Sequence, residues 1–119
     1  MHPWLRYLAA AQAIYYGLTG IWPIVHMRSF LAVTGPKKDL WLVKTVGAMI
    51  VCIALTIGVA AWRNAISLEI LVLAVSSAAA LTIVDINYVA RKVISPIYLL
   101  DAIPEIGLIV AWLLLWLRR

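Results

Sequence analysis

The sequence predicts an all-α integral membrane protein, a four-helix bundle whose helices alternate in direction. Its 119 residues are 66% hydrophobic and 13% charged, and a soluble domain of this size leaves too much surface in water to hide that apolar content. Four apolar blocks cover most of the chain, each close to the ~20 residues that span hydrocarbon. Short connections between them favour an up-down-up-down arrangement. We therefore expect one transmembrane domain over residues 1–119, with helices at about 4–26, 40–62, 66–90 and 96–117.

The first apolar block, residues 4–26, is expected to be a retained helix rather than a cleaved signal peptide. Its apolar run is longer than that of a signal segment, and its small residues come at its start rather than its end. Several polar side chains recur at steps of three or four and so share one helical stripe, which should face the other helices. These stripe residues are Gln12, Tyr16, Thr19, Pro23 and His26.

The connection over residues 27–39 contains the turn signal Gly35-Pro36, and Asp39 is placed to cap the next helix. Apolar residues in its first half predict a short amphipathic piece at the membrane interface. Lys44 lies about one turn inside the second block, where its ammonium either reaches back to the lipid headgroups or pairs with buried acids. Lys44 begins a helical stripe whose other members are small, which suits close contact with another helix. These members are Gly47, Val51, Ala54 and Gly58.

The last two blocks have clear start signals. Ser67 is placed to cap the third helix, and Ser95-Pro96 opens the fourth with a cap followed by proline at the first helical position. Near the far end of the third block come Asp85 and Tyr88. Asp85 is about one and a half turns from Arg91 and Lys92, so we expect it at the inner edge of the hydrocarbon.

The fourth block carries two acids, Asp101 and Glu105, inside an apolar run. Their spacing of four puts both on one helix face. Pro104 lies between them and removes the backbone hydrogen bond to the Leu100 carbonyl. A carboxylate within hydrocarbon costs roughly 2.5 kcal/mol or more near a helix centre, so such residues have partners or a function.

Alternating helices would bring polar residues from all four blocks into one half of the bundle. His26 ends the first helix on this layout, Lys44 begins the second, and Glu105 lies nearest the midplane. The predicted binding residues are Glu105, Asp101, Asp85, Lys44, Tyr88 and His26. Two interpretations stay open: a site for a cation, and a structural role in which the acids pair with basic residues and fix the helix register.

Composition argues against several other functions. The net charge of +5 comes from Lys and Arg at the ends of the blocks, which is typical of contact with lipid headgroups and not of a nucleic-acid surface. The single cysteine, Cys52, excludes an intrachain disulfide or a dithiol pair. His26 with Asp101 and Glu105 would offer mixed ligands, but no HxxxH or cysteine pairing supports them, so we predict no metal and no cofactor.

The ends of the predicted spans carry interface residues. The six tryptophans lie near span ends, as do Arg118 and Arg119, and such residues anchor helices at the headgroups. Lys and Arg are somewhat more frequent on the side of the first and third connections, which favours placing the termini outside.

Three runs of sequence resemble a group of small, uncharacterised bacterial four-span membrane proteins: LAVTGPKKDLWLVKTVG, VDINYV and SPIYLLDAIPE. In size and number of spans the chain is also similar to DoxX-like membrane proteins. Small multidrug transporters share four short spans and a membrane glutamate, but theirs lies in the first helix, where this chain has none. The resemblance implies a bacterial inner membrane and no particular activity.

Two functions follow from the residues. The first is a binding or transport module in which the acids hold a cation, a proton or a cationic small molecule within the bundle. The alternative is a structural or accessory subunit of a larger membrane complex. An enzyme comes third, because no nucleophile–base pair or cofactor motif is present. The expected partners are the lipid bilayer and either further copies of the chain or a larger membrane complex.

Overall fold

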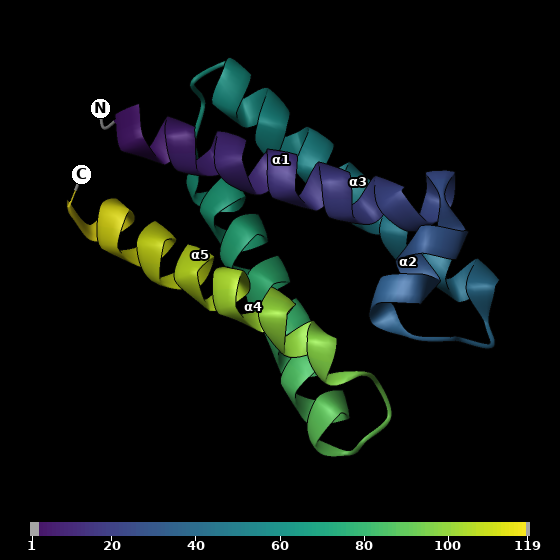
Figure 1. The fold of residues 1–119 in the computed structure, drawn as a ribbon. Helices are drawn as coiled ribbons and strands as arrows, with labels where there is room; N and C mark the ends of the chain where they lie inside the picture. Colours follow the sequence, from purple (N-terminus) through teal and green to yellow (C-terminus); the bar gives the residue numbers. More distant parts are fainter. Residues whose placement is uncertain (1–2, 119) are drawn as a thin grey trace.

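The computed structural model describes residues 3–118, and within them it contains helices and no strand (Figure 1). A short helix, α2 (Met27–Thr34), follows the first span, and a 3-10 turn, η1 (Pro96–Tyr98), precedes the last. The four long helices are α1 (Pro3–Val25), α3 (Leu40–Trp62), α4 (Leu68–Ala90) and α5 (Leu99–Arg118). All four spans are long and apolar enough to cross a membrane, so the predicted all-α, multi-pass class is confirmed. Arg119, a predicted interface anchor, lies outside the described residues.

The first predicted helix ends just before His26. α1 ends at Val25, and His26 caps α2 by accepting a hydrogen bond at Nδ1 from the backbone N–H of Ser29, at 3.2 Å. His26 was expected to continue the inward stripe of α1, but this break leaves it exposed. Gln12 and Tyr16, earlier on the same stripe, are fully buried. The stripe therefore holds along α1 and ends where the helix ends.

Two of the three predicted helix caps form. Ser67 accepts a hydrogen bond from the N–H of Ile70 at 3.3 Å. Ser95 accepts one from the N–H of Ile97 at 3.3 Å, although it opens the turn η1 rather than the α-helix directly. Asp39 precedes α3, but its side chain makes no capping hydrogen bond. The predicted cap at Asp39 is therefore wrong.

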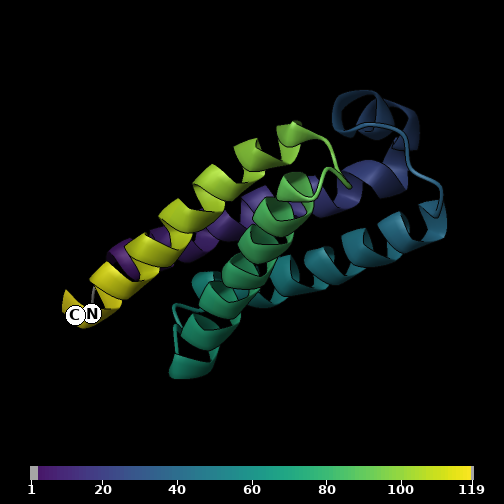
Figure 2. The same ribbon diagram turned by 90° about the horizontal axis from the view of Figure 1, so that it is seen from below.

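The long helices alternate in direction and pack as two pairs, α1 with α3 and α4 with α5 (Figures 1 and 2). α1 and α3 approach most closely where Gly20 meets Gly47. A Cβ atom at Gly20 would lie 2.6 Å from the carbonyl oxygen of Gly47, so no larger residue fits without moving the backbone. Small residues permit this kind of close approach between membrane helices. The small stripe predicted for the second block supplies the contact.

The two pairs join at one end of the molecule and diverge toward the other (Figure 1). Both chain termini and the α3–α4 connection lie at the joined end (Figure 2). Arg6 links α1 to the end of α3 there, because its Nε donates a hydrogen bond to the carbonyl of Ala61 at 2.7 Å. The core packed there consists of Leu5, Ala9, Ile57, Ala61, Leu71, Ala74 and Trp112.

The diverging side, called the open end below, carries α2, η1 and the connection between α4 and η1. α2 contacts both α1 and η1. It therefore links the α1–α3 pair to the start of α5 where the long helices themselves have separated. This arrangement positions the cavity described next.

Candidate functional site

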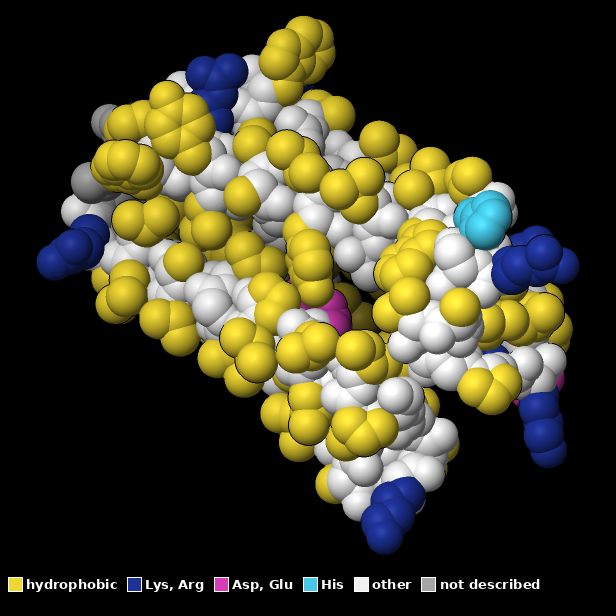
Figure 3. Space-filling model, in the orientation of Figure 1, with side chains coloured by type: hydrophobic (Ala, Val, Ile, Leu, Met, Phe, Trp, Pro, Cys, Tyr) yellow, Lys and Arg dark blue, Asp and Glu magenta, His cyan; other side chains and the backbone are white. Residues whose placement is uncertain are grey.

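A cavity of about 590 Å³ lies between the two helix pairs on the side of the open end. In the space-filling view (Figure 3), a hollow between the pairs is framed by hydrophobic side chains, and an acidic side chain shows within it. All six helical elements contribute to the lining, which is mostly aliphatic and aromatic. The size and the apolar walls are those of a small-molecule site, in which a few polar groups fix the ligand.

Three carboxyl groups line this cavity: Asp85 from α4, and Asp101 and Glu105 from α5. Glu105 is 0% exposed, Asp85 is 5% exposed, and Asp101 is half-buried. Because α4 packs on α5, Asp85 lines the same cavity as Asp101 and Glu105. The structure thus brings together the three acids that the sequence singled out. We call them the acid cluster.

Helix α1 faces the acid cluster with tyrosine hydroxyls. Tyr16 Oη donates a hydrogen bond to Glu105 Oε1 at 2.7 Å, in a fully buried position. Tyr15, its neighbour, donates to Asp101 Oδ1. Hydrogen bonds to carboxylate oxygens are stronger than those between neutral groups. They fix the orientation of both acids of α5 and tie α5 to α1.

The same two helices are joined by another polar contact, nearer the joined end. Trp112 Nε1 donates to Gln12 Oε1 at 2.6 Å, and Gln12 Nε2 donates to the carbonyl of Ala74 at 3.2 Å. Gln12 and Trp112 are both 0% exposed. The contacts of Gln12, Tyr16 and Tyr15 therefore form one line between α1 and α5, which we call the polar seam.

Two oxygens of the acid cluster, Asp85 Oδ2 and Glu105 Oε2, are buried without a hydrogen-bond partner. Across residues 3–118, no Lys, Arg or His nitrogen comes within the 4.0 Å of an ion pair with these acids. Buried polar atoms in folded proteins almost always have a partner, and leaving one unpaired costs about 1–3 kcal/mol. The acid cluster therefore has unused capacity to bind a positively charged group or a proton.

Among the described residues, Lys37 is the basic residue that lines the cavity. Its ammonium is bound elsewhere: Nζ donates to Thr34 Oγ1 at 2.8 Å and to the Gly35 carbonyl at 3.1 Å. It also lies 5.2 Å from the ring centroids of both Phe30 and Tyr98. The sequence placed Lys37 among the headgroup-contacting charges. Gly35, at a φ of +100°, turns the chain there, and Lys37 lies against the end of α2.

The other three predicted binding residues, Lys44, Tyr88 and His26, do not line the cavity. Lys44 is exposed, so the interpretation of Lys44 as a partner for the buried acids is wrong, and its reach to the headgroups stays a prediction. Tyr88 is 39% exposed, and His26 caps α2 at the surface. Val43 and Val46 line the cavity from α3, so Lys44 is outside it because it lies on another face of the same helix. His26 is outside it because α1 ends before His26.

Tyr15, Trp22, Phe30 and Lys37 are among the lining residues that carried no functional prediction. Tyr15 lies one position from the inward stripe of α1. Its spacing of four from Thr19 puts both on one helix face, and this spacing could have predicted that Tyr15 faces the cavity. Trp22 was assigned to the aromatic belt. Phe30 lies on α2 and Lys37 follows it, and both line the cavity where α2 packs against α1 and η1. No local pattern predicts that contact.

The combination of acids, rings and apolar walls is suited to an organic cation. Carboxylates attract positive charge, aromatic faces attract ammonium groups within about 6 Å of the ring centroid, and the aliphatic walls accept an apolar body. Within residues 3–118, no group of three His, Cys, Asp or Glu residues has a geometry that could hold a metal ion.

No family model, no curated protein and no solved structure matches this chain. Its own residues are therefore the basis for the function proposed below.

Proposed function

We propose that this chain is a membrane binding or transport module that takes up a cation with an apolar or aromatic body in the cavity between its helix pairs. The observation that carries the proposal is the acid cluster. Three carboxyl groups line a mostly apolar cavity of about 590 Å³, and two of their oxygens are buried without a partner. Ionisable residues placed inside a membrane span and facing a cavity are candidates for a substrate or ion site by default.

Charge favours a cation over an anion. Asp85, Asp101 and Glu105 face the cavity, and the lining residue of opposite charge, Lys37, already has oxygen partners and two aromatic rings. Electrostatic interactions are stronger in surroundings of low dielectric constant than in water. A positive group would therefore be held beside the acids, and a negative group would be repelled by them.

The lining favours an organic cation over a small inorganic one. Ca²⁺ and Mg²⁺ need six or more oxygen ligands, or several retained waters. The cavity offers three carboxyl groups amid side chains such as Trp22, Phe30 and Leu81. A lipophilic cation has less hydration to lose and fills the apolar volume.

In the empty site the carboxyl groups would hold protons in place of the cation, because isolated negative charge is costly within hydrocarbon. Binding of a cation would then release a proton, and this exchange is the coupling that a transporter of this kind needs. We place this activity in a bacterial inner membrane, on the resemblance of residues 31–47, 84–89 and 95–105 to small bacterial four-span proteins.

The test is calorimetric binding of tetraphenylphosphonium to the protein in lipid nanodiscs, repeated in buffers of different ionisation enthalpy. We expect saturable binding whose measured heat depends on the buffer, because protons are released. Glu105→Gln keeps an oxygen that accepts from Tyr16 and removes the charge. It should weaken binding by at least about tenfold, which corresponds to 1.4 kcal/mol.

Glu69→Gln is the matched control, because Glu69 is an exposed acid in the first turn of α4 and lies outside the cavity lining. Its affinity should equal that of the parent. Equal binding of the neutral analogue triphenylphosphine oxide, or unchanged affinity in Glu105→Gln, would contradict the proposal. The structural role of the acid cluster, in an accessory subunit of a larger complex, would then be favoured.

A further inference from the structure

We propose that Phe30 and Tyr98 form an ammonium-binding cage at the mouth of the cavity, in which Lys37 is a tethered occupant that the incoming ligand displaces. The inference rests on the proposed function and narrows its ligand to an organic ammonium. The cage would be a first binding position for the ligand, ahead of the acid cluster. Lys37, which binds none of the three acids, would be the group that occupies it while no ligand is bound.

The cage is defined by two rings on different elements. Phe30 belongs to α2 and Tyr98 to η1, and Lys37 Nζ lies 5.2 Å from each ring centroid. Both distances are within the range of cation–π attraction, and aromatic cages that recognise quaternary ammonium groups use the same arrangement. A side chain of this protein thus already shows that the two rings can hold an ammonium.

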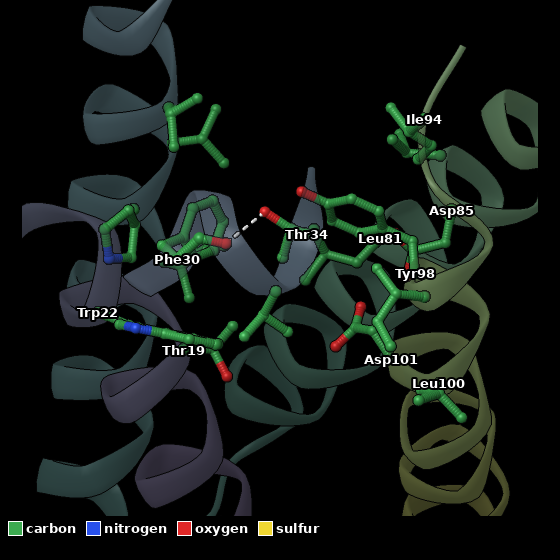
Figure 4. Close-up of a pocket in the computed structure, with 18 of the residues that line it drawn as sticks. Thr19, Trp22, Phe30, Thr34, Leu81, Asp85, Ile94, Tyr98, Leu100 and Asp101 are labelled. Carbon is green, nitrogen blue, oxygen red and sulfur yellow. Dashed lines mark hydrogen bonds between the residues drawn. The ribbon is translucent and has the colours of Figure 1, made fainter. Parts of the chain in front are cut away.

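The hydrogen bonds of the Lys37 ammonium are local. Its acceptors are Thr34 Oγ1 at 2.8 Å, the Gly35 carbonyl at 3.1 Å and the Thr34 carbonyl at 3.4 Å, all at the end of α2. Tyr98 is the contact that crosses to the other side of the cavity, as Figure 4 shows with Phe30 and Thr34 on one wall and Tyr98 on the opposite one. Lys37 can therefore leave the rings while it keeps acceptors on its own segment.

The cage leads toward the acid cluster. Tyr98 precedes Asp101 by three residues and Glu105 by seven, and all three line the same cavity. Tyr98 ends η1 and Asp101 lies in the first turn of α5, so a ligand ammonium released from the rings would meet Asp101 before Glu105. The aromatic rings and the carboxyl groups thus form two successive positions for one positive charge, with Lys37 holding the outer one while the cavity is empty.

Occupation by Lys37 also provides selectivity. A small hydrated ion gains little from aromatic faces, so it would not displace an ammonium that is already in place. An organic ammonium gains the cation–π attraction and buries its apolar groups against the cavity walls at the same time. Displacement thus favours ligands that carry both features.

The first experiment measures the binding of benzyltrimethylammonium to the protein in nanodiscs by calorimetry. Lys37→Gln empties the cage and should raise the affinity by roughly threefold or more, because the ligand no longer competes with a tethered ammonium for the two rings. Lys38→Gln makes the same charge change at the neighbouring lysine, which is exposed and outside the lining. It should leave the affinity near that of the parent, and Lys37→Arg should as well.

A double variant tests whether the gain comes from the rings. Phe30→Leu combined with Lys37→Gln removes one wall of the cage, so the tighter binding of Lys37→Gln should disappear. An equal gain in Lys37→Gln and Lys38→Gln would mean that only surface charge matters and would overturn the cage, while tetraphenylphosphonium binding through Glu105 would still stand. If the parent binds neither probe, the proposed function fails together with the inference.

A second experiment needs no variant. Displacement should make Lys37 more reactive toward an amine-modifying reagent when benzyltrimethylammonium is bound, with Lys38 in the same peptide region as the reference, read by mass spectrometry. A rise in the ratio of Lys37 to Lys38 labelling at saturating ligand supports the inference. An unchanged or lower ratio overturns it, whatever the behaviour of Lys37→Gln.

Discussion

At the joined end, α1 and α5 meet through Gln12 and Trp112 inside an apolar core, whereas nearer the open end they meet through tyrosines and carboxyl groups beside a cavity. Both ends of the Gln12 side-chain amide are hydrogen-bonded, to Trp112 and to the carbonyl of Ala74. In the acid cluster, by contrast, Asp85 Oδ2 and Glu105 Oε2 have no partner. The polar seam thus has all its hydrogen bonds at the Gln12 end and unpaired carboxyl oxygens at the other end.

The difference has a physical reason. Small and apolar side chains such as Ala9, Ala74 and Ile57 let the helix pairs close at the joined end. Facing carboxyl groups repel one another when charged, so the helices that carry them gain nothing by closing further without a cation or proton between them. We infer that the joined end supplies most of the stability and the open end supplies the binding capacity. Three predictions test that division.

The largest effect is expected at Trp112, which is fully buried in the core of the joined end. Trp112→Ala leaves a large void and removes the donor to Gln12, so it should lower the free energy of unfolding by about 3–5 kcal/mol. Trp62→Ala is the control, because Trp62 is 77% exposed. This variant should change the free energy of unfolding by about 0.5 kcal/mol or less. Unfolding in mixed micelles with increasing dodecyl sulfate measures both. Similar losses in the two variants would refute the assignment of the core.

A smaller effect is expected along the polar seam at Tyr16. Tyr16→Phe leaves Glu105 Oε1 without its donor in a fully buried place and should cost about 1–2 kcal/mol. Tyr15→Phe removes the matching donor to Asp101, but Asp101 is only half-buried and can be hydrated from the cavity. The Tyr15 variant should lose less in the same unfolding assay. The reverse order would mean that burial of the carboxyl group does not decide the cost of losing its donor.

The smallest effect compares the helix caps at the two ends. Ser67 caps α4 at the joined end with a hydrogen bond to Ile70 N–H, and Ser67→Ala should cost about 1 kcal/mol. Asp39 precedes α3 at the open end and makes no such bond, so Asp39→Ala should leave the unfolding free energy nearly unchanged. A loss at Asp39 as large as that at Ser67 would show a cap that the structure lacks.

The sequence by itself determined the membrane class, the four spans and most of their bounds. These follow from local properties: a run of apolar residues long enough to cross hydrocarbon, a capping serine, and a turn at Gly35-Pro36. It also determined that Asp101 and Glu105 share a face, and that Gln12 and Tyr16 share a face of α1, because helical periodicity decides which residues lie on one side.

Only the tertiary structure decided which of these faces meet and how tightly. The α1–α3 contact through Gly20 and Gly47 and the divergence of the two helix pairs depend on the packing of distant segments. The orientation of α3 left Lys44 outside the cavity while Val43 and Val46 line it. The reversal after α2 placed Lys37 between the rings of Phe30 and Tyr98. Periodicity fixes the direction of a side chain relative to its own helix, but its distance to a residue on another helix depends on contacts that no local pattern encodes.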